Sequence, residues 1–246
     1  MKGSPDLANV RVILVEPRGP FNIGTAARIM KNMGLDDLGL VNPADFHNNE
    51  AYQGAVGARD LLERARVFDS VSEAVRDTHL VVGTTRRTGR SRRVFCTVEE
   101  LPERVFPVTA EGKAAILFGR EDSGLLNAET DLCHVLVRIP SSSSFPSLNL
   151  SHAVAVVCYK LFTDAMVTRV PYVLKPASNA EIEGLLDYIQ HVFADLGFFS
   201  KGAPGYVVNL FRKVFGRALL DREEIKELTF IFHRLHGLCA NKEHEQ

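Results

Sequence analysis

Three stretches of small and polar residues have the composition of ligand-binding loops. Residues 22–28 follow a run of β-branched residues, and residues 118–124, with two glycines, follow another. A third stretch, residues 141–152, carries seven serines or asparagines and runs straight into an apolar helical pattern. Glycine permits close approach of a backbone to a ligand, and serine and asparagine supply hydrogen bonds and helix caps. Three such loops after strands predict one shared site.

A fourth segment is rich in arginine. Five arginines lie close together, at Arg86, Arg87, Arg90, Arg92 and Arg93. The planar guanidinium pairs with phosphate through two hydrogen bonds, so a loop of this kind can position a polyanion without making the whole protein basic. The alternative is a solvated charged loop, although neither a turn nor a surface needs five guanidiniums that repel one another.

Other single residues have weaker signals. Arg28 lies one turn inside the helix expected after Asn22, whose N-terminus could hold an anion. Glu121 follows a strand and is either a carboxylate anchor, an acid or base, or a solvated turn residue. His233 and His236 have helical spacing, which an amphipathic helix explains without a metal. The fingerprints of dinucleotide and nucleotide-triphosphate sites are absent.

Composition excludes several classes of protein. The 29 lysines and arginines nearly balance the 30 aspartates and glutamates, so charge alone does not favour nucleic acid or an anionic membrane. The four cysteines form no CxxC pair, which indicates neither a disulfide framework nor a thiolate zinc site. The amino-terminal residues lack an apolar signal core. These features predict a soluble cytoplasmic protein.

The elements that must position these loops can be expected from periodicity. Strands are expected at residues 10–15, 38–41, 80–82, 115–118 and 135–139, each followed by polar or helical sequence. The alternation predicts an α/β fold with a mostly parallel sheet and helices on both faces. Helices are expected after Asn22, with Gly34 as the stop, and over residues 150–166.

A second unit is expected after the prolines at residues 171 and 176. Ser178 and Glu181 form a capping box before a helix that ends near Gly197. Two further amphipathic patterns follow, the second beginning at Asp221. The sequence therefore predicts a domain at residues 1–171 and a small all-α extension at residues 172–246.

The three loops together resemble the ordered motifs of the SPOUT-superfamily RNA ribose 2′-O-methyltransferases of the SpoU family. The matching residues are Asn22-x-Gly24-x-x-Ala27-Arg28, Phe118-Gly119-Arg120-Glu121 with Gly124, and Ile139 followed by Ser147-Leu148-Asn149-Leu150. The helical tail is similar to that of the TrmJ-like branch. Pro146 departs from the pattern, because a serine is common at that position in the branch, and the serine run before it is unusual.

The resemblance implies a C-terminal trefoil knot and S-adenosylmethionine as methyl donor, with no metal. It assigns the donor site to Thr84, Thr85, Arg86, Gly119, Ile139, Pro146, Ser147 and Leu148. It assigns the reaction to Arg28, Asn22, Glu121, Ser147 and Asn149. RNA contacts are expected from Arg28, Arg86, Arg87, Arg90, Arg92 and Arg93.

The roles within the reaction follow from chemistry only in part. Arg28 is expected to clamp the phosphate beside the reacting hydroxyl and to stabilise developing negative charge, with Glu121 holding the arginine. Ser147 or Asn149 would orient the hydroxyl. A deprotonated Arg28 that serves as the base itself is the alternative.

The substrate expected from the resemblance is tRNA, methylated on the ribose of cytidine or uridine at anticodon-loop position 32. Alternatives are ribosomal RNA as substrate of the same chemistry and a noncatalytic RNA-binding dimer that kept the fold. A metabolite enzyme on a doubly wound sheet ranks last, because its phosphate-binding glycines are missing. The expected assembly is a homodimer that shares its active sites, with neither membrane nor DNA as a partner.

Overall fold

The structure is a computed structural model and describes residues 5–86, 94–167, 175–199 and 204–240. Within these residues, seven strands form one sheet in the order β3-β2-β1-β6-β4-β7-β5, and each neighbouring pair is parallel. The strands are β1 (Val10–Val15), β2 (Asp37–Val41), β3 (Arg66–Phe68), β4 (Leu80–Thr84), β5 (Val94–Thr97), β6 (Ala114–Phe118) and β7 (Val135–Arg138). All five strands expected from the sequence are confirmed, and β3 and β5 are additional.

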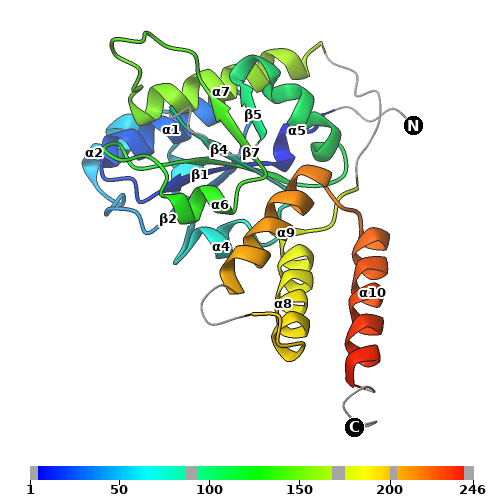
Figure 1. Cartoon of the computed structure of the whole chain (residues 1–246). Helices are drawn as coiled ribbons and strands as arrows, with labels where there is room; N and C mark the ends of the chain where they lie inside the picture. Colours follow the sequence, from blue (N-terminus) through cyan, green and yellow to red (C-terminus); the bar gives the residue numbers. More distant parts are fainter. Residues whose placement is uncertain (1–4, 87–93, 168–174, 200–203, 241–246) are drawn as a thin grey trace.

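Helices cover both faces of the sheet (Figure 1). On one face lie α1 (Pro20–Asn32), α2 (Asn49–Gly54), α3 (Arg59–Glu63), α5 (Leu101–Thr109) and α7 (Leu150–Ala165). On the other lie α4 (Val71–Ala74) and α6 (Asn127–Asp131). Two 3-10 turns, η1 (Leu7–Asn9) and η2 (Val98–Glu100), precede β1 and α5. The α/β fold class is therefore confirmed.

Strand β1 shows how the sequence builds this two-sided core. Val12 and Leu14 belong to the apolar cluster under α1 and α7, whereas Ile13 and Val15 belong to the cluster under α4 and α6. Side chains of a strand alternate between faces, so a strand covered on both sides must be apolar at every position. Arg11 is the exception in β1, and it is completely buried.

Three helices form the carboxyl-terminal part: α8 (Asn179–Asp195), α9 (Pro204–Ala218) and α10 (Arg222–Ala240). They enclose an apolar cluster of their own. The expected capping box is present, because Ser178 Oγ accepts a hydrogen bond from Glu181 N, and Glu181 Oε2 accepts one from Ser178 N. Gly197 ends α8 with a positive φ of 63°. The boundary expected between residues 171 and 172 lies outside the described residues and stays a prediction.

Helices α8 and α9 pack at the edge of the sheet where β4, β6 and β7 begin, and α10 packs against α8 (Figure 1). The first free N–H groups of α8 donate into the loop before β4: Asn179 N bonds to Thr78 O at 2.9 Å, and Ala180 N bonds to Arg76 O at 3.3 Å. Helix N-termini need such acceptors for their unpaired N–H groups. No helix in the described part of the chain is long and apolar enough to cross a membrane.

His134, just before β7, lies buried in this contact. Its Nδ1 accepts a hydrogen bond from Val81 N at 3.1 Å, and Gly216 of α9 packs against its ring. Burial lowers the pKa of His134 to about 4, although the hydrogen bond with Asn179 and the charge of Glu183 act in the opposite direction. The neutral ring is thus the form that holds α9 against the sheet.

This burial predicts acid sensitivity of folding. The unfolded chain binds a proton at His134 with a pKa near 6.5, above the folded value of about 4. The contribution of His134 to the free energy of unfolding is therefore fully present above pH 6.5. It is lost as the pH falls toward 4, and the loss is roughly 2 kcal/mol at pH 5. Burial also lowers the pKa of His79, which adds in the same direction. Urea unfolding at pH 7.5 and pH 5 measures the loss.

A His134→Gln variant should lose part of this pH dependence, whereas His152→Gln, at an exposed position of α7, should keep all of it. An unchanged pH slope in His134→Gln contradicts the assignment.

Candidate active site

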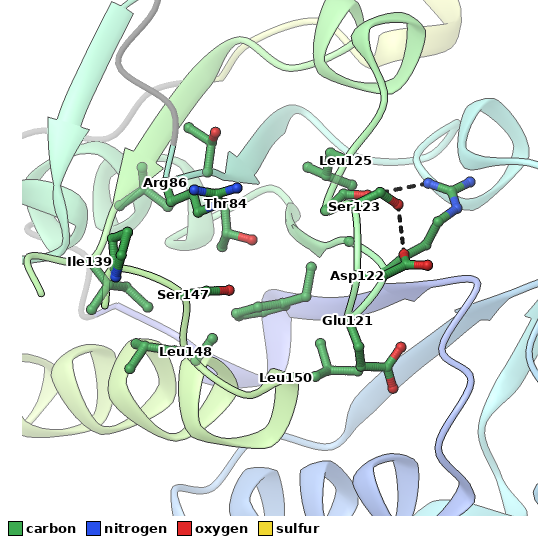
Figure 2. A pocket seen from close by; sticks show the side chains of 18 residues that line it. Thr84, Arg86, Glu121, Asp122, Ser123, Leu125, Ile139, Ser147, Leu148 and Leu150 are labelled. Atoms are coloured by element: carbon green, nitrogen blue, oxygen red, sulfur yellow. Dashed lines mark hydrogen bonds between the residues drawn. The ribbon is translucent and has the colours of Figure 1, made fainter. Parts of the chain in front are cut away.

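A pocket opens at the carboxyl ends of β4, β6 and β7, opposite the edge that carries the carboxyl-terminal helices (Figure 2). Its walls come from three segments, residues 84–86, 118–125 and 137–153. All eight residues predicted to bind a cofactor line it: Thr84, Thr85, Arg86, Gly119, Ile139, Pro146, Ser147 and Leu148. The structure therefore brings two of the three predicted loops together with the end of β4.

Ten further residues line the pocket but were not assigned to the cofactor. Five of them belong to the quoted motifs, namely Phe118, Arg120, Glu121, Gly124 and Leu150, and Glu121 had been assigned to catalysis. The other five, Asp122, Ser123, Leu125, Val137 and Ala153, were not singled out in the sequence. Most belong to the loop after β6, whose two glycines were the available signal. Apolar and polar walls are mixed, and the empty space, including the part open to solvent, is about 840 Å³. A pocket with such mixed walls suits a small molecule that has both apolar and polar parts.

Glu121 lies at the edge of the pocket beside Leu150 (Figure 2) and binds the beginning of α1. Its Oε1 accepts hydrogen bonds from Gly19 N at 3.1 Å and Asn22 Nδ2 at 3.2 Å, and its Oε2 accepts one from Arg18 N at 3.1 Å. Helix α1 begins at Pro20 and has no side-chain cap of its own. Glu121 thus supplies the cap from about 100 residues away in the chain.

These bonds also decide the ionisation of Glu121. Partial burial raises the pKa of this carboxyl, but the N–H groups of Arg18 and Gly19, its own N–H group and the Asn22 amide outweigh the burial and lower it. An ionised carboxylate with this many donors is an anchor rather than an acid. Of the roles left open for Glu121, the structure favours the anchor.

The anion expected at the N-terminus of the helix after Asn22 is the chain's own carboxylate of Glu121, and the helix begins earlier, at Pro20. Residues 22–25 therefore do not form a ligand loop. These residues are inside α1, and the N–H groups before the helix already bind Glu121. Gly24 serves helix packing instead, because a Cβ there would lie 1.9 Å from Ala51 O of α2. Glycine is needed at this position because two helices cross closely there.

Arg28 lies on the exposed side of α1 and is not among the pocket-lining residues. The described residues offer it no hydrogen-bond or ion-pair partner. Glu121 was expected to hold Arg28, but it binds Arg18, Gly19 and Asn22 instead. Glu121 therefore reaches Arg28 only through the helix that carries it.

Ser147 and Asn149 stand at the start of α7. Ser147 lines the pocket, and its side chain points toward the centre (Figure 2). Asn149 caps α7 as expected, with its Oδ1 accepting from Ser151 N at 2.9 Å and Ser151 Oγ at 2.7 Å. Its amide nitrogen is the part of Asn149 left for a substrate. The loop that contains the serine run has a hydrogen bond of its own, because Ser141 Oγ donates to Pro146 O at 2.9 Å.

The predicted RNA-binding arginines are described only in part. Arg86 is exposed at the pocket, whereas Arg87, Arg90, Arg92 and Arg93 lie outside the described residues. In the helical extension, Arg212 forms two short hydrogen bonds with Glu183, at 2.8 and 2.6 Å, and joins α9 to α8. No group of residues suited to a metal ion occurs in the described ranges.

Comparison with known proteins relates this geometry to chemistry. Residues 9–159 match the model of the SpoU rRNA Methylase family. The chain is 34% identical to the tRNA (cytidine/uridine-2′-O-)-methyltransferase TrmJ of Sodalis glossinidius, over 98% of this chain and 93% of that protein.

Two solved structures extend the comparison. The crystal structure of TrmJ from Z. mobilis ZM4 has a TM-score of 0.80 at 32% identity, over 92% of this chain and 98% of that one. The SpoU methyltransferase AviRb from Streptomyces viridochromogenes, in complex with the cofactor AdoMet, shares the fold with a TM-score of 0.54 at 23% identity, over 66% of this chain and 60% of that one.

Proposed function

Because the chain belongs to the SpoU methylase family and is therefore a methyltransferase, we propose that it methylates the ribose 2′-hydroxyl of cytidine or uridine at anticodon-loop position 32 of tRNA. The observation that carries this substrate is the near-complete match to a tRNA (cytidine/uridine-2′-O-)-methyltransferase. That match covers the three carboxyl-terminal helices as well as the sheet. The homologous structure from Z. mobilis likewise spans both parts.

S-adenosylmethionine is the proposed donor, and the pocket has the residues that it needs. Phe118, Ile139 and Leu148 offer apolar surface for the adenine, while Thr84 and Ser147 offer hydrogen-bonding groups. The related fold of AviRb holds this cofactor. When bound, S-adenosylmethionine would supply a methyl group to an oxygen nucleophile without a metal, and S-adenosylhomocysteine would be the leaving group.

The residues of the chain then have separate tasks. Ser147, at the pocket, and the Asn149 amide orient the ribose hydroxyl. Arg28 clamps the neighbouring phosphate and stabilises the negative charge that develops on the attacking ribose oxygen, because a guanidinium donates hydrogen bonds and does not accept them. The proton of the hydroxyl passes to solvent. Glu121 and Asn22 fix the start of the helix that carries Arg28. Arg86 extends the positive surface toward the RNA backbone.

A homodimer with shared active sites completes the proposal. Arg28 is exposed and does not line the pocket of its own chain, which supports a role at the pocket of a second copy. Large apolar side chains on α1 and at α7 are available for association. Phe21 is 49% exposed, Tyr159 is 58% exposed and Met166 is 73% exposed. Exposed apolar surface of this extent commonly marks an interface.

The trefoil knot belongs to the proposal as well. Strand β7 lies between β4 and β5, which follow each other in the chain, and such an insertion is what a threaded segment requires. A tRNA substrate would place the protein in the cytoplasm. Ribosomal RNA is the second candidate substrate, because the matching family is described as rRNA methylases.

The proposed activity can be tested with radiolabelled S-adenosylmethionine and unmodified total tRNA or ribosomal RNA. Nuclease digestion then maps the labelled ribose. Label at position 32 of the anticodon loop supports the proposal. Label in ribosomal RNA alone keeps the chemistry and changes the substrate, whereas RNA binding without transfer supports a noncatalytic dimer.

A further inference from the structure

The loop between β6 and α6, residues 119–124, serves two parts of the site. Gly119, Asp122 and Ser123 form a wall of the pocket. Glu121, in the same loop, caps α1, the helix that carries Arg28. A small shift of this loop would therefore disturb both the pocket and the helix. One side chain of the loop, Arg120, binds two segments on either side of it.

Arg120 uses every donor of its guanidinium. Nε and Nη2 donate to Glu16 at 2.8 and 2.5 Å, and Nη1 and Nη2 donate to Glu129 at 3.0 and 2.8 Å. Nη1 also reaches Gly124 O at 3.4 Å. The side chain is 7% exposed. A guanidinium has five N–H donors in a planar fork, and all five are engaged here.

The partners of Arg120 are themselves held in place. Glu16 directly follows β1, has a φ of 46° and donates its N–H group to Val41 O at 2.8 Å. Glu129 lies in α6 and accepts a hydrogen bond from Leu126 N at 2.7 Å. The hydrogen bond from Arg120 lowers the pKa of Glu16, so this partner is ionised at neutral pH. Arg120 thus connects the end of β1, the start of α6 and the turn at Gly124.

We propose that Arg120 is a positioning residue for methyl transfer. It holds the loop at residues 119–124 so that one side of the loop shapes the donor pocket while Glu121 fixes α1 and Arg28. The inference rests on the proposed function. Arg120 belongs to the pocket lining, but its guanidinium donors are taken by Glu16, Glu129 and Gly124, so it acts through the loop and not by contact with the substrate. Removing its hydrogen bonds should weaken donor binding and slow transfer together.

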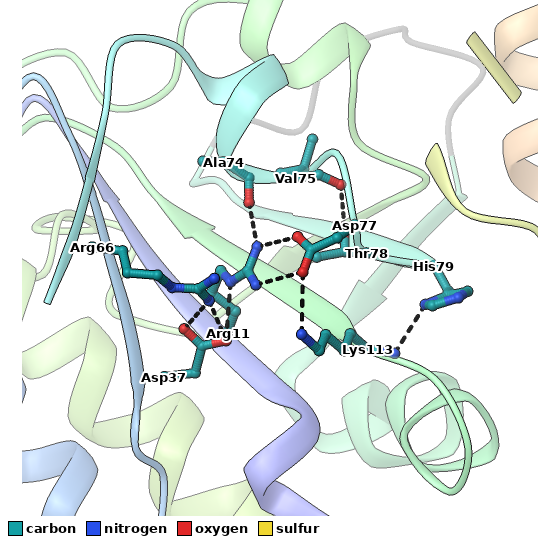
Figure 3. Close-up of polar contacts among 9 residues, drawn as sticks. All are labelled: Arg11, Asp37, Arg66, Ala74, Val75, Asp77, Thr78, His79 and Lys113. Atoms are coloured by element: carbon teal, nitrogen blue, oxygen red, sulfur yellow. Dashed lines mark hydrogen bonds and ion pairs between the residues drawn. The ribbon is translucent and has the colours of Figure 1, made fainter. Parts of the chain in front are cut away.

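Arg11 provides a matched control (Figure 3). It is 1% exposed and donates to two carboxylates and one carbonyl, those of Asp37, Asp77 and Ala74, at distances of 2.5 to 3.0 Å. Its chemistry therefore matches that of Arg120. Its position does not, because Arg11 stands near the start of β1, at the sheet edge opposite the pocket, and none of its partners lines the pocket.

The experiment compares Arg120→Lys with Arg11→Lys in the full chain. Lysine keeps the charge but has three donors on one nitrogen and cannot bridge two carboxylates in the same way. Donor affinity is measured by calorimetry with S-adenosylmethionine and S-adenosylhomocysteine, the melting temperature by calorimetric scanning, and loop order by hydrogen exchange of residues 17–22 and 119–125.

Arg120→Lys should weaken donor affinity by about 10- to 100-fold and speed exchange in both segments. Arg11→Lys should lower the melting temperature at least as much, while donor affinity stays within about twofold. If Arg120→Lys does not fold, Glu16→Gln is the second variant, because it removes one charge at nearly constant shape. It should weaken donor affinity and speed exchange in the same two segments, by smaller amounts.

Two results would overturn the inference. One is a folded Arg120→Lys protein with the donor affinity and exchange of the wild type. The other is an equal loss of donor affinity in Arg11→Lys, which would mean that general destabilisation explains the effect. If the wild type binds neither nucleoside, the proposed function fails, and exchange of residues 119–125 still decides whether Arg120 positions the loop.

Discussion

Replacing Arg28 with alanine is expected to lower kcat by roughly 100- to 1000-fold, the usual effect of removing one group that stabilises transition-state charge. The affinity for S-adenosylmethionine should change by less than about twofold, because Arg28 does not line the donor pocket. Stability should change little, since Arg28 is exposed and has no partner among the described residues. Single-turnover transfer to tRNA and calorimetry of the donor measure the two effects.

Arg104→Ala is a suitable control for Arg28→Ala. Arg104 is an exposed arginine on a helix of the same face, α5, and does not line the pocket. The same loss of a cation should leave turnover close to that of the wild type. Wild-type turnover in Arg28→Ala would remove Arg28 from the mechanism.

The parallel sheet could be predicted because buried strands and amphipathic helices leave periodic patterns. Strands β3 and β5 were not predicted, and the reason is physical. They have three and four residues, and β3 is an edge strand whose Val67 is 55% exposed. A strand that is short and half exposed does not show the continuous apolar run of a buried one. Short helices such as α4, with four residues, leave equally little pattern.

The residues of the pocket proposed for the donor could be grouped from the sequence, because the loops that follow β6 and β7 carry two of the motifs. The position of the first motif could not be predicted in the same way. Asn22 and Arg28 were assigned to the reaction, and α1, which carries them, lies outside the pocket lining of its own chain and is joined to it by Glu121. A hydrogen bond between residues 99 positions apart has no period in the sequence. The five hydrogen bonds of Arg120 likewise leave no periodic pattern in the sequence.

Gly119→Ala is expected to produce the other large effect, a loss of donor affinity of at least about 100-fold. A Cβ at residue 119 would lie 2.1 Å from Gly124 C and 2.2 Å from Leu125 N. Both are backbone atoms, so the turn must open and the pocket wall must move. Overpacking of this kind commonly costs about 1–3 kcal/mol of stability or more. Gly184→Ala is the control, because nothing lies within 4 Å of its Cβ on the exposed side of α8.

The Gly119 and Arg28 variants together can decide whether protomers share a site. In mixed dimers of Gly119→Ala and Arg28→Ala, one chain keeps the donor pocket and the other keeps the arginine. If Arg28 serves the pocket of its partner, equal mixing should restore up to about a quarter of wild-type activity, because half of the dimers are mixed and each has one complete site. The gain is smaller if the opened turn at Gly119 also shifts α1 through Glu121. If Arg28 serves its own pocket, no mixed dimer contains a complete site and activity stays absent. Methyl transfer after mixing, unfolding and refolding separates these outcomes.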